Sequence, residues 1–264
     1  MRFALGLEYD GTHFSGWQSQ PGGNTVQDVL ETALTRIAAM PVRVMCAGRT
    51  DAGVHALAQV AHFDCAAERS PTAWVRGVNA HLSSQVAVRW AVSVPEDFHA
   101  RFSARGRHYR YLLLNRSVRP GLLSNRVGWC HQALDLEAMQ TAAACLIGEH
   151  DFSSFRAAEC QAKSPVKTMC RFEITRSEDL ICFDCSANAF LHHMVRNLVG
   201  ALVYVGMGRR PVDWIGELLV ARDRRIAAPT FAPHGLYLAG VDYDACWALP
   251  ETRVSSSNPC WPAA

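Results

Sequence analysis

Lysine is almost absent from this chain of 264 residues. Long apolar runs and a recognisable export signal are missing as well. Only Lys163 and Lys167 are lysines, so arginine supplies nearly all of the positive charge. The longest apolar segments, such as the one that begins at Leu198, are far shorter than the roughly 20 residues that a membrane span needs. The N-terminal segment reaches Glu8 and Asp10 too early for a secretory signal. We therefore expect a cytoplasmic protein that does not enter a membrane.

A metal-binding cysteine pattern is also missing, although the chain has 10 cysteines. Cys182 and Cys185 form the single C-x-x-C pair, and no second pair stands at the spacing of zinc ligands. Without an export signal, the cysteines are expected to be free thiols, many of them buried. We expect no bound metal.

Acidic residues are missing between Asp97 and Asp135, whereas the net charge of the whole chain is only +2. Seven arginines fall in this interval: Arg101, Arg105, Arg107, Arg110, Arg116, Arg119 and Arg126. Such a basic run is suited to a phosphate backbone. A solvated surface explains the same run equally well, so charge alone leaves both interpretations open.

The apolar pattern, in a chain that is 49% hydrophobic, predicts a folded protein with mixed helices and strands. Phe3 to Tyr9 alternates like a strand. Asn24 offers an N-cap for a helix that ends before Pro41, and residues 190–205 have the apolar stripe of a second long helix. Strand, loop, helix and strand follow one another in each half, which indicates two similar α+β units.

These patterns divide the chain into three parts. We expect an N-terminal α+β domain over residues 1–104 and a C-terminal α+β domain over residues 105–248. Residues 249–264 are rich in serine and proline and cannot bury much surface, so they are expected to be disordered.

The stretch AGRTDAGVHA, residues 47–56, places Asp51 in a loop between two predicted strands. Gly48 and Gly53 permit a tight backbone path that presents the side chain of Asp51. An aspartate in such a turn often only hydrogen-bonds its own backbone. Alternatively, Arg49 favours the ionised carboxylate, which is then a nucleophile.

Histidines and a distant arginine are further candidates with two interpretations each. His55 is either a general base or metal ligand, or a residue that packs the turn. On a helix, His192 and His193 point about 100° apart and cannot chelate one metal together. Arg196 shares a helix face with His192 and is either a partner of Asp51 or a surface residue.

Tyr109 and Tyr111 alternate with basic residues in RGRHYRY, residues 105–111. On a strand the two rings face the same way, and aromatic residues among cations suit base stacking beside phosphates. Two strand tyrosines are, however, more often part of a core.

Most of these candidate residues fall in four segments: EYDGTHFSGWQ (residues 8–18), CAGRTDAGVHALAQVAHF (46–63), ARFSARGRHYRY (100–111) and NAFLHHMVRNLVG (188–200). Together they closely resemble the tRNA pseudouridine synthase A family, and the resemblance runs in order over residues 2–243. It implies the pseudouridine synthase fold, an α+β fold of two similar mixed halves with predominantly antiparallel sheets and a catalytic cleft between them.

The resemblance also implies an isomerase that converts uridines 38, 39 and 40 in the anticodon stem-loop of tRNA, with no cofactor or metal. Asp51 matches the catalytic aspartate, and Tyr109 matches the residue that stacks on the uracil. Arg49 and Arg196 match contacts around the carboxylate, and Leu236 matches the apolar residue on the other side of the base. The family works as a homodimer with tRNA in basic clefts. RNA backbone contacts are expected from Arg101, Arg105, Arg107 and Arg110.

Two other functions use the same features. A hydrolytic N-glycosidase would use the carboxylate with water as the final acceptor and release free uracil. An RNA chaperone would bind tRNA without catalysis, and its role would survive the change Asp51→Asn.

Overall fold

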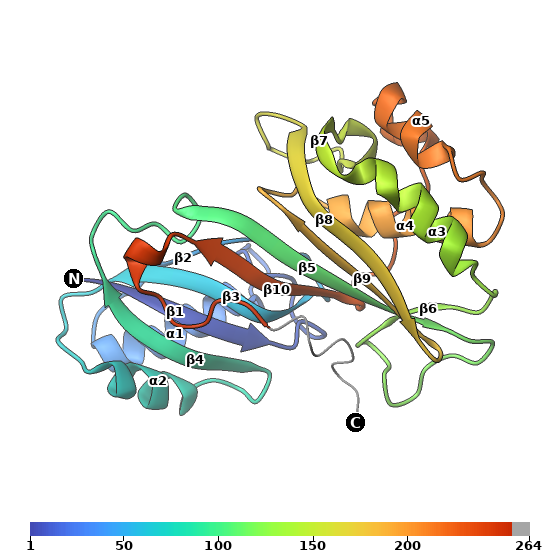
Figure 1. Ribbon diagram of the computed structural model, residues 1–264. Coiled ribbons are helices and arrows are strands. Elements are labelled where there is room, and N and C mark those ends of the chain that lie inside the picture. Colours follow the sequence, from blue (N-terminus) through green and yellow to red (C-terminus); the bar gives the residue numbers. More distant parts are fainter. Residues whose placement is uncertain (255–264) are drawn as a thin grey trace. The chain divides into compact units, whose positions relative to one another are not determined.

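A computed structural model describes residues 1–254 of the chain (Figure 1). These residues form two compact units. The first contains Met1–Arg107 and the segment that begins at Tyr237, and the second contains His108–Leu236. No helix within residues 1–254 is long and apolar enough to cross a membrane.

The first unit is a mainly antiparallel sheet with two helices. The strands lie in the order β4, β1, β3, β10, and β2 pairs with β3. β1 runs antiparallel to β3 and β4, whereas β10 pairs with β3 in parallel. The strands are β1 (Arg2–Tyr9), β2 (Val44–Cys46), β3 (His55–Asp64), β4 (Val86–Val94) and β10 (Leu236–Tyr243), and a short 3-10 turn, Ala245–Trp247, follows β10.

Two amphipathic helices, α1 (Val26–Ala38) and α2 (Pro71–Asn79), accompany this sheet (Figure 1). Trp74 of α2 is fully buried against Phe3 and Phe63, so β1, β3 and α2 share one apolar core. The side chain of Thr25 accepts a hydrogen bond from the Asp28 amide and is therefore the N-cap of α1. The prediction of Asn24 as the N-cap is therefore wrong.

The second unit has strands in the order β5, β9, β8, β7, with β6 beside β5. β7, β8 and β9 pair antiparallel, and β5 pairs with β6 in parallel. The strands are β5 (Ala104–Asn115), β6 (Gly128–Cys130), β7 (Gly148–Asp151), β8 (Val166–Ser177) and β9 (Leu180–Ala187). The helices are α3 (Leu136–Ala143), α4 (Met194–Gly206) and α5 (Trp214–Ala221), with 3-10 turns at Ala144–Leu146, Ser153–Phe155 and Arg224–Ile226. The expected α+β class with predominantly antiparallel sheets is confirmed.

Helix α4 starts four residues later than expected, at Met194 rather than Phe190. His193 has a left-handed backbone with φ of 62°, which breaks the helix before it. His192 and His193 therefore lie in a turn, where their ring centroids are 4.0 Å apart. The expected helical separation of the two histidines is wrong, and His192 does not share a helix face with Arg196.

The compact units divide the chain differently from the expected ranges 1–104 and 105–248. The division falls inside β5, between Arg107 and His108. From Tyr237 the chain returns to the first unit, because Tyr237 and Leu238 of β10 pair with His55 and Ala56 of β3. A return of this kind joins distant segments by backbone hydrogen bonds and leaves no local sequence signal.

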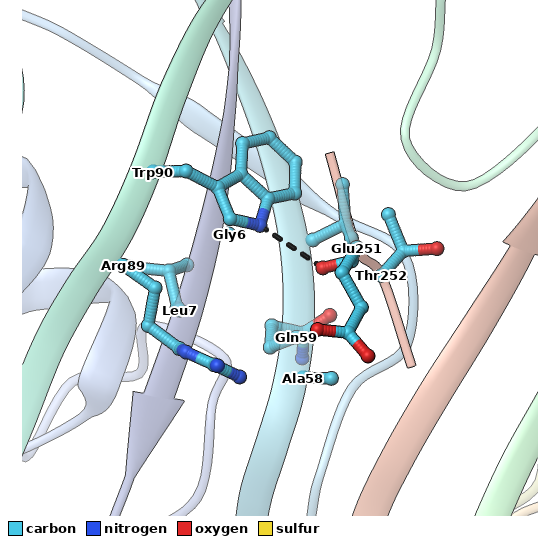
Figure 2. Close-up of a pocket in the computed structure, with 9 residues that line it drawn as sticks. Gly6, Leu7, Ala58, Gln59, Arg89, Trp90, Glu251 and Thr252 are labelled. Atoms are coloured by element: carbon cyan, nitrogen blue, oxygen red, sulfur yellow. Dashed lines mark hydrogen bonds between the residues drawn. The ribbon is translucent and has the colours of Figure 1, made fainter. Parts of the chain in front are cut away.

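The start of the expected disordered tail is ordered. Gly240 and Arg253 form an antiparallel bridge, and the Val254 amide donates to the carbonyl of Ala239. The indole nitrogen of Trp90 donates to the carbonyl of Glu251 at 3.2 Å, and both residues line a small pocket with residues of β1 and β3 (Figure 2). Disorder is therefore wrong for residues 251–254, and residues 255–264 lie outside the described part of the chain.

Candidate active site

Asp51 lies half-buried in the loop between β2 and β3. The Val54 amide donates to the Asp51 carbonyl at 3.1 Å, which closes the turn after the aspartate. Gly53 has φ of +75°, a conformation that glycine adopts at little cost. The expected glycine-bounded turn is therefore present, and it orients the backbone on both sides of Asp51.

Buried polar groups hold the start of this loop. Gln59 of β3 has no exposed surface, and its Nε2 donates to the Gly48 carbonyl at 2.6 Å. The hydroxyl of Tyr9 lies 2.8 Å from Oγ1 of Thr50. Because buried polar groups are costly to leave without partners, these bonds fix the backbone before Asp51.

The glycine-rich segment after β1 packs directly on the aspartate loop. The Trp17 amide donates to the Thr50 carbonyl at 2.9 Å. A Cβ on Gly11 would lie 2.0 Å from the carbonyl oxygen of Val54, and one on Gly16 would lie 2.8 Å from that of Thr50. Glycine at these two positions allows the two loops to touch backbone to backbone.

His55 stabilises the same arrangement. Its Nδ1 lies 3.1 Å from the Gly11 amide nitrogen and 3.1 Å from Oδ1 of Asp10. Its ring is buried and stacks on Tyr237 with the centroids 4.6 Å apart. These contacts favour the packing interpretation of His55.

Arg49 is exposed on this loop. Its charge lowers the pKa of the nearby Cys46 thiol, but burial dominates and raises that pKa to about 12. Cys46 is therefore a neutral thiol at ordinary pH. A contact of Arg49 with the carboxylate of Asp51 stays a prediction.

The other expected substrate contacts lie in the second unit. Tyr109 of β5 is 8% exposed, and its ring and that of Phe190 meet edge to face with the centroids 4.9 Å apart. Tyr111 is fully buried, and its hydroxyl donates to the Ala232 carbonyl at 2.8 Å. Tyr111 is thus a residue of the core. Tyr109 is slightly exposed and packs against Phe190.

Arg196 and Leu236 are held by the segment of residues 231–236. The Nε of Arg196 donates to the Phe231 carbonyl at 2.9 Å. The Leu112 amide of β5 donates to the carbonyl of Gly235, the residue before Leu236. One segment thus ties β5, which carries Tyr109, to α4, which carries Arg196, and to Leu236.

Two of the four expected RNA-contacting arginines have exposed side chains. Arg101 is exposed and lies over the ring of Phe102, 5.6 Å from its centroid. Arg105 has a side chain that is 71% exposed and pairs with Asp244 at 2.6 Å.

The other two arginines have structural partners. Arg107 donates to the backbone carbonyls of Ala47 and Arg101 at 3.1 and 2.7 Å. Arg110 is 2% exposed and pairs with Asp184 at 3.0 Å. Burial removes Arg110 from the surface, so the expected phosphate contact does not fit this residue.

Three supports of the loop were not expected from the sequence: Gln59, Tyr9 and Thr50. Gln59 did leave a signal, because it is a polar residue between Ala58 and Val60 in an apolar strand. A polar group at a core position generally needs a specific partner.

Comparisons with known proteins match nearly the whole chain. The profile of a family described as tRNA pseudouridine synthase matches residues 7–103 and 142–244. A protein of Dechloromonas aromatica named tRNA pseudouridine synthase A is 65% identical over 95% of this chain and 96% of its own length. Proteins of the same name from Methylobacillus flagellatus and Aromatoleum aromaticum are 60% and 61% identical over 96% of this chain and 97% of their own lengths.

Proposed function

Because the chain belongs to the tRNA pseudouridine synthase family, we propose that this isomerase acts on uridines 38, 39 and 40 of the tRNA anticodon stem-loop, with Asp51 as its catalytic residue. The observation that carries the proposal is the support of the Asp51 loop by Gln59 and by the segment of residues 10–17. A carboxylate held in this way is preorganised for chemistry.

The reaction breaks the C1′–N1 bond of uridine and forms a C1′–C5 bond. The Asp51 carboxylate attacks C1′ or assists departure of the uracil, as glycosidase carboxylates do at an oxocarbenium-like centre. After the base turns, C5 bonds to C1′ and loses its proton, while N1 gains one. Product and substrate are isomers, so the reaction consumes no second reactant.

The freed uracil must be retained while it turns. We propose that the ring of Tyr109 stacks on the uracil and that Leu236 covers its other side. Phe190 packs against the Tyr109 ring in an edge-to-face contact and supports it. Apolar cover also excludes water, which limits hydrolysis of the intermediate.

The target base must leave its stack, at a cost of a few kcal/mol. Contacts with the RNA backbone offset this cost, and we propose that the exposed Arg101 and Arg105 make them, with Arg49 and Arg196 closer to the target uridine. We do not assign a phosphate contact to the other two arginines. Arg107 supports the Asp51 loop through the Ala47 carbonyl, and Arg110 is buried. We also propose that the protein is cytoplasmic and that its active form is a homodimer. Sedimentation of the purified protein tests the oligomeric state.

The decisive experiment is tritium release from tRNA that carries 5-tritiated uridine. Asp51→Asn is expected to reduce release to background while tRNA affinity stays within about threefold, because phosphate contacts dominate binding. Asp179→Asn, a change at an exposed carboxylate in a turn of the second unit, is the control and keeps full activity. Turnover of Asp51→Asn at the wild-type rate contradicts the proposed role.

The same reaction separates the two rival functions. Chromatography of digested tRNA is expected to give one pseudouridine for each uridine lost. Free uracil in place of pseudouridine identifies a hydrolytic glycosidase. Binding without either product identifies an RNA chaperone.

A further inference from the structure

Phe102 is the most exposed of the large apolar side chains described in the first unit, with 75% of its surface accessible. An isolated exposed apolar residue is ordinary on a protein surface. Phe102 differs because of its surroundings, which include a guanidinium over its ring and a loop that is extensively hydrogen-bonded.

The loop of residues 99–103 holds the ring in place. The Nδ1 of His99 accepts hydrogen bonds from the amides of Arg101 and Phe102 at 3.1 and 3.3 Å. The His99 amide donates to the hydroxyl of Ser103 at 3.0 Å, and the Ser103 amide donates back to the His99 carbonyl at 2.8 Å. The exposure of Phe102 is therefore a feature of an ordered turn.

One face of Phe102 packs on the histidine that organises the turn. The ring centroids of His99 and Phe102 lie 4.3 Å apart. Burial and the charge of Arg2 lower the pKa of His99, which keeps the ring neutral and its Nδ1 able to accept both amides. His99 thus supports one side of the ring, and 75% of the surface of Phe102 is still accessible beside the guanidinium of Arg101.

Arg107 fastens this turn to the loop of the catalytic aspartate. Its guanidinium donates to the carbonyls of Arg101, Ala104 and Ala47 at 2.7, 3.3 and 3.1 Å. Ala47 is four residues before Asp51. The exposed ring is consequently placed on the same backbone framework as the aspartate.

We propose that Phe102 is a stacking platform for an unpaired base of the tRNA other than the target uridine. This inference rests on the proposed function, in which Tyr109 takes the target base. Bases in RNA loops are recognised by stacking on aromatic rings, and arginine beside the ring adds attraction for the phosphate. Charge favours RNA over a second copy of the chain, because the exposed guanidinium of Arg101 lies over the ring and no acidic residue occurs in the sequence between Asp97 and Asp135.

Substitutions at Phe102 test the need for an aromatic ring. Phe102→Ala and Phe102→Leu are expected to weaken binding of an anticodon stem-loop RNA about tenfold, and Phe102→Tyr by less than about twofold, as expected for loss and retention of one stacked base. The rate of tritium release at saturating tRNA stays within about twofold for all three, because Tyr109 still holds the target. Met45→Ala, at an apolar side chain that is 55% exposed in the same unit, is the control and leaves affinity unchanged.

Salt dependence separates stacking from charge. Phe102→Ala leaves the slope of log Kd against log salt unchanged, whereas Arg101→Ala reduces it by about 1. A fully paired RNA duplex is expected to bind Phe102→Ala and the wild type equally, because it offers no unpaired base.

Other outcomes overturn the inference. Wild-type affinity of Phe102→Ala for the stem-loop contradicts stacking, even if Asp51→Asn is inactive as proposed. Full affinity of Phe102→Leu, together with a changed sedimentation coefficient of Phe102→Ala, assigns the ring to a contact between copies of the chain. Conversely, the binding measurements test Phe102 even if the protein releases no tritium. Failure of the proposed reaction can therefore be distinguished from failure of the proposed stacking.

Discussion

The hydroxyl of Tyr9 and Oγ1 of Thr50 lie 2.8 Å apart, and this hydrogen bond fastens the end of strand β1 to the residue directly before Asp51. Thr50 has only 7% of its surface exposed, and Tyr9 has 4%. The position of the carboxylate thus depends on a buried polar contact between segments that are 41 residues apart.

Removal of the Tyr9 hydroxyl is expected to affect catalysis more than binding. Tyr9→Phe loses the bond to Thr50 and lowers the free energy of unfolding by about 1 kcal/mol. We expect kcat to fall several-fold while KM stays constant, because the displaced loop carries Asp51. Tyr243→Phe is the control, since it removes a hydroxyl bonded to the Ala100 carbonyl and should lose similar stability with kcat unchanged. Equal kcat values for the two variants contradict this role of Tyr9.

A methyl group at Gly11 is expected to push the two loops apart. The added Cβ would lie 2.0 Å from the Val54 carbonyl oxygen, so the backbone must shift. We expect Gly11→Ala to cost about 1–3 kcal/mol in the free energy of unfolding and to lower kcat. Gly22→Ala, in the same connection between β1 and α1, has no atom within 4 Å of the added Cβ and no positive φ. Urea denaturation should leave Gly22→Ala unchanged or slightly more stable, and a cost at Gly22 as large as that at Gly11 contradicts the steric explanation.

The ordered start of the tail is expected to stabilise the first unit. A chain that ends at Pro250 loses the bond from Trp90 to Glu251 and the bonds of Thr252 and Val254 to β10. At about 1 kcal/mol for each bond, the loss is about 3 kcal/mol, and Tm is expected to fall by about 6–12 °C for a chain of this size. A chain that ends at Val254 keeps these contacts and is the control in calorimetry. The same Tm for the two truncated chains contradicts the prediction.

Acid is expected to destabilise the first unit through His62. Burial, His99 and Arg2 lower the pKa of His62 from its usual 6.5 to about 4, and its Nδ1 accepts the Ala100 amide at 3.1 Å. The unfolded chain therefore binds a proton that the folded chain does not. Stability is lost as pH falls from about 6.5 to about 4, by about 2–3 kcal/mol in total.

The variant His62→Asn retains an acceptor near the Ala100 amide but has no proton to gain. Urea denaturation at a series of pH values should give this variant a smaller loss of stability between pH 6.5 and 4 than the wild type. Identical slopes for the two proteins in this interval exclude His62 as the source of the acid effect.

Local patterns predicted several elements and the loop of Asp51. Helical spacing of apolar residues after residue 25 and alternation in β1 depend only on neighbouring residues, so α1 and β1 were predicted. The glycines around Asp51 predicted its turn for the same reason. The start of α4 was missed because the left-handed backbone of His193 has no strong signature in its own sequence.

What the sequence by itself determined is the set of residue types and the order of motifs, from the GRTDAGVH stretch to the arginine-rich segment, that define the family. Tertiary structure decided which polar residues support the loop and which arginines are exposed. Tyr9 and Thr50, or Arg110 and Asp184, are 41 and 74 residues apart and meet only because the chain folds back on itself. The free energy of a buried hydrogen bond or ion pair depends on the final position of both partners, and a linear pattern does not contain that information.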